Sequence, residues 1–263
     1  MTIIVTGSYG LIGGAIFDNL LGSTYTPIGI DKITGDSIES FTRRITCNEE
    51  KIDAIIHCAA NCIIREVISN PELAKENIDS TFDILEYART NDVKKFIYFS
   101  SSRVTHDETN PYIASKKFGE ELTKAYCECY GIDYLIIRPE TVWGLEDSHM
   151  RVITNWIDSA ECGEDLLVYG SEDKELPPIH VKDFVKAFFD LFTSFMENDI
   201  NNVTYTISGK IMTAKEITDI ILDVTNSKSN VLYFEPEVTQ PQTCKPADIT
   251  HGAFRTRLEE ELK

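Results

Sequence analysis

The sequence lacks the features of a membrane-spanning, exported or nucleic-acid-binding protein. Its 263 residues contain no apolar run near the roughly 18 residues of a membrane span. Its start, "MTIIVTG", has neither the basic segment nor the long apolar run of a secretion signal. Only 25 basic residues face 43 acidic ones, and a net charge of −18 disfavours nucleic acid and anionic membranes as partners. We therefore expect a soluble, cytoplasmic protein whose anionic substrates would need a locally basic pocket.

Metal-ligand and disulfide patterns are also missing. The seven cysteines are odd in number and include no C-x-x-C pair, and the five histidines are scattered. Zinc and other metal sites normally show such clustered spacings, so we expect no metal site. Reduced thiols in a cytosolic protein are the simplest interpretation of the cysteines.

Apolar strands alternate with amphipathic helices over the first half of the chain. Runs such as "TIIVTG", "IDAIIHCAA", "KKFIYFSS" and "GIDYLIIRP" are separated by helical patterns at 11–21, 71–90 and 112–130. This alternation predicts an α/β fold, a Rossmann-like doubly wound parallel sheet. Beyond Pro139 the pattern loosens, with helices expected at 151–160, 181–196 and 213–224. We expect a Rossmann domain over 1–150, with later returns from about 175–210, and an interleaved, smaller substrate-binding lobe over 151–263.

A glycine-rich turn follows the first strand. The stretch "VTGSYGLIGG" places Gly7, Gly10 and Gly13 between a strand and a helix, where bare backbone and a helix N-terminus can hold a pyrophosphate. The alternative is a glycine-rich turn without a ligand. Asp31 ends the second strand, where a carboxylate would bind both ribose hydroxyls and favour NAD over NADP. Lys32 weakens that preference, and an aspartate that merely caps a turn is the alternative.

A tyrosine and a lysine stand four residues apart at 112–116. Tyr112 and Lys116 therefore face the same side of the predicted helix. A phenol has a pKa near 10, and a nearby ammonium plus a positive, oxidised nicotinamide ring would lower it. Such a phenol could move a proton while hydride moves at the attached carbon. Taken alone, the pair could equally be two side chains on a helix.

Several motifs, in order along the chain, give the pair its context. Together they resemble the extended short-chain dehydrogenase/reductase superfamily, and in particular the nucleotide-sugar epimerase-like members of the NAD-dependent epimerase/dehydratase family. The resemblance covers about residues 1–225. It rests on "TGSYGLIG", "DAIIHCAA", "ENIDSTFDILEYA", "FIYFSS", "NPYIASKKFGE", "IIRPETVWG" and "IHVKDFVKAF".

The resemblance implies roles for individual residues. Tyr112 would be the general acid/base, Lys116 would bind the nicotinamide ribose, and Ser101 would hydrogen-bond the reacting oxygen. Asn77 would hold a helix and the cofactor pocket rather than do chemistry. The implied NAD contacts are Gly7, Tyr9, Gly10, Leu11, Ile12, Gly13, Asp31, Lys32, Asp36, Ala59, Ala60, Asn77, Ser100, Tyr112, Lys116, Pro139 and Thr141. The implied substrate contacts are Ser101, Ser102, Arg103 and Lys174.

The sequence departs from the family pattern around the substrate. Ser101 and Tyr112 are eleven positions apart, whereas relatives have a longer loop that helps cover the sugar. Ser102 and Arg103 stand where sugar 4,6-dehydratases carry an Asp-Glu pair, which disfavours a dehydratase. The site is either more open than in relatives, or another element closes it.

Two further departures concern the nucleotide. The segment before "HV" lacks the arginine that binds the diphosphate and offers Lys174, a point charge without a bidentate fork. Arg65, Arg103 and Arg151 could compensate, although each could equally be a surface residue. The region after Asp31 is compressed, and Asp36 is either an adenine contact or a surface acid.

The leading hypothesis is an NAD-dependent enzyme that modifies a sugar, most plausibly a nucleotide-activated one, with epimerisation by transient oxidation favoured. One alternative is an NAD(P)-dependent reductase of a keto-sugar or a smaller ketone or aldehyde. The other is a non-catalytic NAD-binding regulator. Relatives commonly pair through two long helices, here 71–90 and 112–130, so a homodimer is expected.

Overall fold

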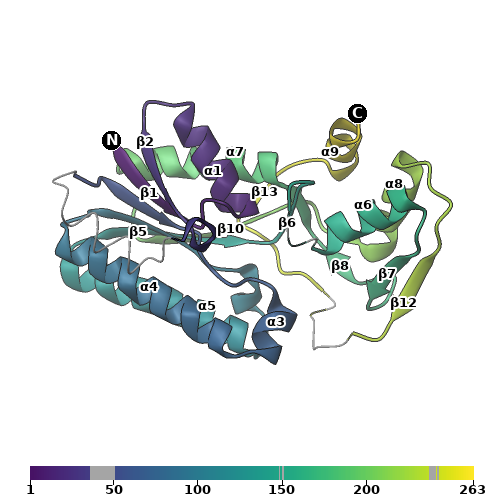
Figure 1. Cartoon of the computed structure of the whole chain (residues 1–263), viewed down its shortest axis with the longest axis horizontal. Helices are drawn as coiled ribbons and strands as arrows, with labels where there is room; N and C mark the ends of the chain where they lie inside the picture. Colours follow the sequence, from purple (N-terminus) through teal and green to yellow (C-terminus); the bar gives the residue numbers. More distant parts are fainter. Residues whose placement is uncertain (36–50, 148, 150, 237–240, 242) are drawn as a thin grey trace.

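A seven-stranded parallel sheet forms the centre of the computed structural model, which describes residues 1–35, 51–147, 149, 151–236, 241 and 243–263 (Figure 1). The strand order is β13-β10-β5-β4-β3-β1-β2. Because β2 and β3 lie on opposite sides of β1, the direction of winding reverses there, which is where such sheets bind ligands. The expected α/β class is confirmed. The strands are β1 (Thr2–Thr6), β2 (Thr26–Ile30), β3 (Ala54–His57), β4 (Lys95–Phe99), β5 (Asp133–Pro139), β10 (Val203–Ser208) and β13 (Ile249–Thr250).

Helices cover both faces of the sheet. Helices α1 (Leu11–Leu21) and α7 (Val181–Met196) pack on one face, and α4 (Glu72–Thr90) and α5 (Pro111–Tyr130) pack on the other. Successive strand residues point to opposite faces, so each strand feeds two cores. In β1, for example, Ile3 and Val5 join the α1/α7 core while Ile4 joins the α4/α5 core. This double burial explains why the strands are continuously apolar.

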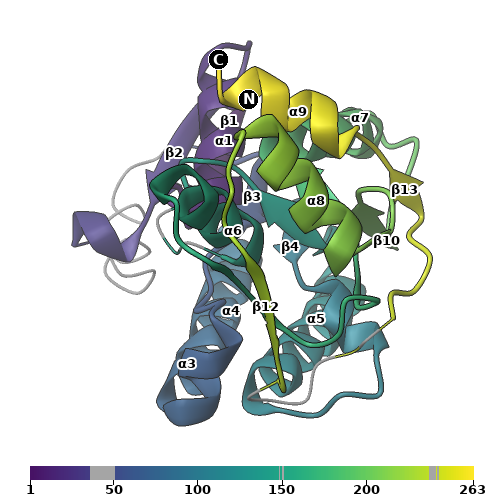
Figure 2. The ribbon, with the colours of Figure 1, turned by 90° about the vertical axis from the view of Figure 1, so that its right-hand side faces the viewer.

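The later part of the chain builds a smaller lobe with its own core, seen on the right of Figure 1 and in front in Figure 2. Buried aromatic and aliphatic side chains from its helices, among them Trp156 and Ile217, form this core together with Trp143. The division into 1–150 and 151–263 stays a prediction. The helices of this part are α6 (Val152–Cys162), α8 (Ala214–Val224) and α9 (Phe254–Glu261). Its strand pairs are β7 (Leu166–Tyr169) with β12 (Val231–Phe234), β8 (Glu175–Leu176) with β11 (Met212–Thr213), and β6 (Thr141–Trp143) with β9 (Pro178–His180).

The expected helices lie within about two residues of their predicted ends, but α9 and α3 (Ile64–Ser69) were not predicted. Helix α9 buries only Phe254 and Leu258, which is too few apolar positions for a helical period to be recognised. A bidentate ion pair fixes it instead: Arg257 Nε and Nη2 donate to Asp183 of α7 at 2.9 and 2.6 Å. The residue Asp36 lies outside the described residues.

None of the helices in the described part of the chain combines the length and the hydropathy that a membrane span requires. Over the same residues, no group of three or more His, Cys, Asp or Glu side chains could hold a metal ion.

His57, at the end of β3, is an uncharged histidine inside the sheet. Its ring is 1% exposed and lies 2.7 Å from Thr6 Oγ1 through Nδ1 and 3.1 Å from Thr81 Oγ1 through Nε2. Burial, and secondarily the charge of Lys116, lowers its pKa to about 3. Because the unfolded chain takes up the proton near pH 6.5, the stability provided by neutral His57 is present above that pH and is lost as pH falls.

We therefore expect His57→Gln to reduce the acid sensitivity of folding. Below about pH 6.5, the wild type should lose up to about 1.4 kcal/mol of unfolding free energy per pH unit through this one group. The variant should lack that contribution, although it is less stable at pH 7.5 because its packing is poorer. Urea unfolding at pH 4.5 to 7.5 measures both slopes. Equal slopes for the two proteins would show that His57 is not held neutral.

Candidate active site

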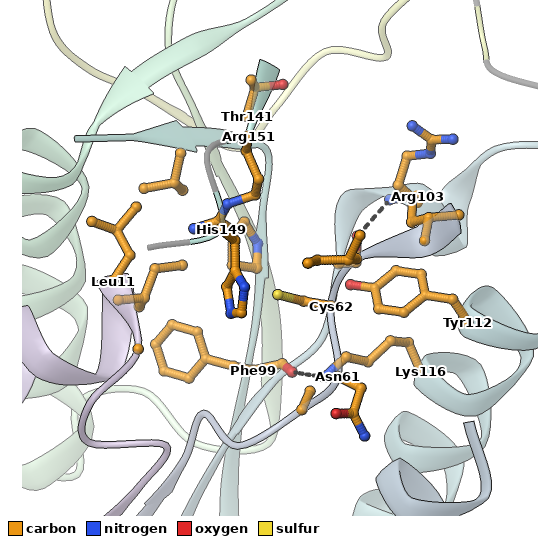
Figure 3. Close-up of a pocket in the computed structure, with 18 of the residues that line it drawn as sticks. Leu11, Asn61, Cys62, Phe99, Arg103, Tyr112, Lys116, Thr141, His149 and Arg151 are labelled. Carbon is orange, nitrogen blue, oxygen red and sulfur yellow. Dashed lines mark hydrogen bonds between the residues drawn. The ribbon is translucent and has the colours of Figure 1, made fainter. Parts of the chain in front are cut away.

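A large pocket lies at the carboxyl ends of the sheet strands, between the sheet and the smaller lobe (Figure 3). Its volume is about 1050 Å³. It brings together every predicted site residue that the structure describes. These residues are Gly7, Tyr9, Gly10, Leu11, Ile12, Gly13, Asp31, Lys32, Ala59, Ala60, Asn77, Ser100, Ser101, Ser102, Arg103, Tyr112, Lys116, Pro139, Thr141 and Lys174.

The glycine loop forms a cradle without side chains at one end of the pocket. Gly7 has φ +70°, and a Cβ there would lie 2.8 Å from the backbone nitrogen of Ala59. A Cβ on Gly13 would lie 2.1 Å from the carbonyl oxygen of Gly7. Both positions therefore exclude any other residue. The loop opens α1, whose first N–H groups are available to an anion, so the residues fit the pyrophosphate of a dinucleotide.

Asp31 lies beside this cradle and also caps a turn. Its Oδ2 accepts a hydrogen bond from Tyr9 N at 3.0 Å, and its Oδ1 accepts one from Ile33 N at 3.1 Å. The second bond caps the short 3-10 turn Lys32–Thr34. The Asp31 carboxylate thus caps a turn, and it also lines the pocket. Lys32 donates to Asn61 Oδ1 at 2.9 Å, so its ammonium is turned toward the loop after β3.

Asn77 ties that loop to two helices. Its Oδ1 accepts from Asn61 N at 2.7 Å, while its Nδ2 donates to Asn61 O at 3.1 Å and to Ser115 Oγ at 3.3 Å. The side chain is 4% exposed. All of its bonds go to the protein, which suits the expected holding role.

The tyrosine, the lysine and the serine meet at the other end of the pocket. Tyr112 and Lys116 project from the first turns of α5 and are 6% and 4% exposed. Lys116 Nζ donates to Phe99 O at 2.9 Å, at the end of β4 (Figure 3). Ser101, which follows Phe99 by two residues, hydrogen-bonds the Tyr112 hydroxyl. Asn110 begins the helix by accepting from Ile113 N at 3.0 Å, ahead of a proline at the first helical position.

Burial dominates the electrostatics of this pair. It raises the pKa of Tyr112 to about 12 and lowers the pKa of Lys116 to about 8. The hydrogen bond from Ser101 and the charges of Arg151 and Arg103 oppose the rise at the phenol. The expected lowering of the phenol pKa includes the charge of oxidised NAD and stays a prediction; without that charge, burial keeps the pKa of Tyr112 high.

The short connection between Ser101 and Tyr112 folds into a compact corner. Residues Ser102–Thr105 form a 3-10 turn, and Arg103 pairs with Glu108 through Nε and Nη2 at 2.8 and 2.6 Å. This pairing occupies much of the guanidinium that was expected to contact substrate.

The C-terminal region supplies a wall beside that corner. Pro241 and Cys244 line the pocket. Cys244 N donates to Glu175 Oε2 at 2.7 Å, and Lys245 Nζ donates to the carbonyl oxygen of Thr105. A segment about 140 residues away in sequence thus contacts the short connection between Ser101 and Tyr112.

Lys174, the expected diphosphate ligand, is also committed within the protein. Its Nζ donates to Tyr169 O at 3.0 Å, and burial lowers its pKa. The side chain still lines the pocket on the side of the smaller lobe.

Sequence reasoning gave no role to Cys62 and His149, and it left Arg151 as either a compensating cation or a surface residue, but all three line the pocket. Glu140, next to the predicted contact Pro139, lines it too. Figure 3 shows Arg151 and His149 entering from one side while Tyr112 enters from the other. Burial raises the pKa of Glu140, which hydrogen-bonds Ser102. These residues have no diagnostic spacing in the sequence.

Comparisons with known proteins agree with this architecture. The chain is 27% identical over 266 residues to a putative UDP-glucose 4-epimerase of Methanocaldococcus jannaschii, with 89% of this chain and 86% of the relative covered. It is 24% identical over 315 residues to a dTDP-glucose 4,6-dehydratase of Haemophilus influenzae, with 100% and 92% covered.

A solved structure shows the same fold. It is a mutant UDP-glucuronic acid 4-epimerase from Bacillus cereus, in complex with UDP-4-deoxy-4-fluoro-glucuronic acid and NAD. The TM-score is 0.88 at 19% identity, and the alignment covers 99% of this chain and 98% of that one.

The family model of the NAD dependent epimerase/dehydratase family matches residues 3–207, which is most of the chain. Its span includes the glycine cradle, Asp31, Ser101, Tyr112 and Lys116, so the resemblance drawn from the sequence motifs is confirmed. The cofactor of this family is NAD. The chain belongs to the NAD dependent epimerase/dehydratase family.

Proposed function

We propose that the protein epimerises a nucleotide-activated sugar by transient oxidation of one ring carbon. The observation that carries this proposal is the meeting of Tyr112, Lys116 and Ser101 in the same pocket as the glycine cradle. A cradle alone would fit any dinucleotide-binding regulator. Three buried groups that can donate or accept protons lie at the reacting end, and they favour an enzyme over a regulator.

The chain's own residues would carry the proton steps. When bound, NAD supplies the acceptor and donor of hydride. The Ser101 hydroxyl would hold the substrate oxygen, and Tyr112 would take its proton as the carbon is oxidised and return it on reduction. Since the protein alone keeps the pKa of Tyr112 high, the positive charge of oxidised NAD would complete the lowering begun by Ser101 and Arg151. Lys116, fixed on Phe99 O, would orient the cofactor ribose.

A nucleotide sugar is supported by the cations that line the pocket. In a chain with net charge −18 the lining of this pocket is balanced, because six lysines and arginines line it beside six aspartates and glutamates, and these cations can contact a diphosphate. The named relatives act on nucleotide sugars. The six residues are Lys32, Arg65, Arg103, Lys116, Arg151 and Lys174.

We favour epimerisation over two alternatives. A 4,6-dehydration needs an acid and a base next to the catalytic hydroxyl, and Ser102 and Arg103 occupy those positions. A reductase would consume NADH, whereas an epimerase returns the hydride and shows no net redox change. We further propose that the lobe formed by 151–263 binds the substrate and that the protein works in the cytoplasm.

Tyr112→Phe should abolish turnover without abolishing cofactor binding. We expect epimerisation to fall at least about 100-fold, because the general acid/base is lost. NAD binding should stay within a few-fold of wild type. The assay is product formation from a panel of nucleotide sugars, with NAD binding followed by fluorescence. Tyr126→Phe, on the outer side of the same helix, is the matched control, and full activity in Tyr112→Phe would refute the mechanism.

Gly13→Ala should abolish NAD binding, whereas Gly14→Ala should not. A Cβ at Gly13 lies 2.1 Å from the backbone oxygen of Gly7, and only a shift of the cradle can relieve this contact. At Gly14 the nearest atom outside the helix, Ser8 O, is 3.3 Å away, and a small adjustment suffices. Calorimetric titration gives the NAD affinity of each variant, and thermal unfolding checks that the two variants are equally stable. Equal affinities would show that the cofactor does not use this loop.

We also propose a homodimer through α4 and α5. Their outer surface exposes Phe82, Phe118 and Tyr130 by 45%, 43% and 49%, and Phe82 packs edge-on against Tyr126 at 6.1 Å between ring centroids. Such grouped aromatic side chains on two adjacent helices are costly to leave in water.

Phe118→Glu should convert a dimer to a monomer, because it replaces an exposed aromatic side chain of this surface by a charge. Light scattering coupled to size exclusion gives the mass directly. Tyr233→Glu, at an equally exposed aromatic position of the smaller lobe, should leave the mass unchanged. A wild-type monomer at micromolar concentration would contradict the proposal.

A further inference from the structure

A buried aspartate organises the loop that enters the pocket before α6. Asp147 is 2% exposed, and its backbone N–H donates to Gly144 O at 3.1 Å. Its Oδ1 accepts from His149 N at 3.3 Å, and its Oδ2 accepts from Arg151 Nε at 2.6 Å. One carboxylate thus binds the backbone of His149 and holds the Arg151 guanidinium through its Nε.

The bond to Asp147 uses the Nε of Arg151 and leaves its two Nη groups to face a ligand. Among the hydrogen bonds of the described residues, the guanidinium makes one through Nε, and its two Nη groups belong to a side chain that lines the pocket. Arg103 differs, since its Nε and Nη2 both bind Glu108. Lys116 and Lys174 point to backbone carbonyls. Arg151 is therefore a prearranged bidentate donor in this pocket.

Arg151 lies at the reacting end of the pocket. Its charge acts on both Tyr112 and Cys62, and Figure 3 shows these side chains converging on one space. The Arg151–Asp147 pair is neutral overall, so it would select a partner by directed, charge-assisted N–H donors of the guanidinium rather than by the net charge of the pair. A group facing Tyr112 belongs to the sugar ring, because Tyr112 works on a ring carbon.

We propose that Arg151, held by Asp147, recognises a carboxylate on the sugar ring, so that the preferred substrate is a nucleotide-linked uronic acid. This inference rests on the proposed function and specifies its substrate class. A guanidinium fork matches the two oxygens of a carboxylate in two parallel, charge-assisted hydrogen bonds, whereas the hydroxymethyl group of a neutral hexose offers a single uncharged oxygen. Arg151 is a specificity-determining residue in this proposal, and Asp147 is its positioning residue.

The test compares two probes that differ only at the sixth carbon, UDP-glucuronic acid and UDP-glucose, in binding and in turnover with the NAD-loaded protein. Wild type should prefer the acid by about 10- to 100-fold, as expected for a charge-assisted contact. Arg151→Met should lose that preference, because it should weaken the binding of UDP-glucuronic acid and leave the binding of UDP-glucose unchanged. Arg151→Lys should recover part of it. Arg255→Met, at an exposed ion pair on α9, is the control and should behave as wild type.

Binding of UDP alone separates this proposal from the other role open to an arginine. If Arg151→Met weakens UDP, UDP-glucose and UDP-glucuronic acid equally, the residue binds the diphosphate and the proposal is wrong. Equal affinity of wild type for both sugars also overturns it. The proposed function fails differently: neither probe nor any other nucleotide sugar is then turned over, while the binding preference still reports on Arg151.

Discussion

One contact with the sheet sets how closely α5 approaches β4. Gly119 lies on the same helical face as Tyr112 and Lys116, and a Cβ there would lie 2.1 Å from the hydroxyl oxygen of Tyr98. The absence of a side chain lets the helix approach β4 closely enough for Lys116 to reach the carbonyl of Phe99 at 2.9 Å. The catalytic spacing therefore results from backbone packing two turns away, and the pKa values of both groups follow from the burial that this packing imposes.

The two ends of the pocket use different physical means. At the cofactor end, bare backbone at Gly7 and Gly13 makes room, and helix α1 offers its N–H groups. At the reacting end, side chains of opposite charge are paired before any ligand arrives, as in Arg103 with Glu108 and Arg151 with Asp147. Pairing offsets the desolvation cost of these buried charges. It also decides which cations keep free donors, and so which of them can discriminate between substrates.

The sequence predicted residues of local motifs better than residues that tertiary packing brings into the pocket. The glycine loop, Asp31, Tyr112 and Lys116 lie in local motifs, where spacing along the chain equals arrangement in space. Arg151 and Cys244 enter the pocket through tertiary packing, which no local pattern encodes. The lowered phenol pKa expected with oxidised NAD bound stays a prediction, and in the protein alone burial raises the pKa of Tyr112. Helix α9 escaped prediction because an ion pair, rather than an apolar stripe, holds much of it.

The wall at Pro241 and Cys244 has a consequence for synthesis of the chain. Every residue of the glycine cradle, the tyrosine–lysine pair and the guanidinium fork is translated by position 151. The wall beside Thr105 needs residues up to 245, and β13 and α9 come later still. Since a nascent chain folds from its N-terminus, the dinucleotide cradle can form on the ribosome well before the substrate end is enclosed. The last fifth of the chain thus determines when the substrate end of the pocket gains this wall.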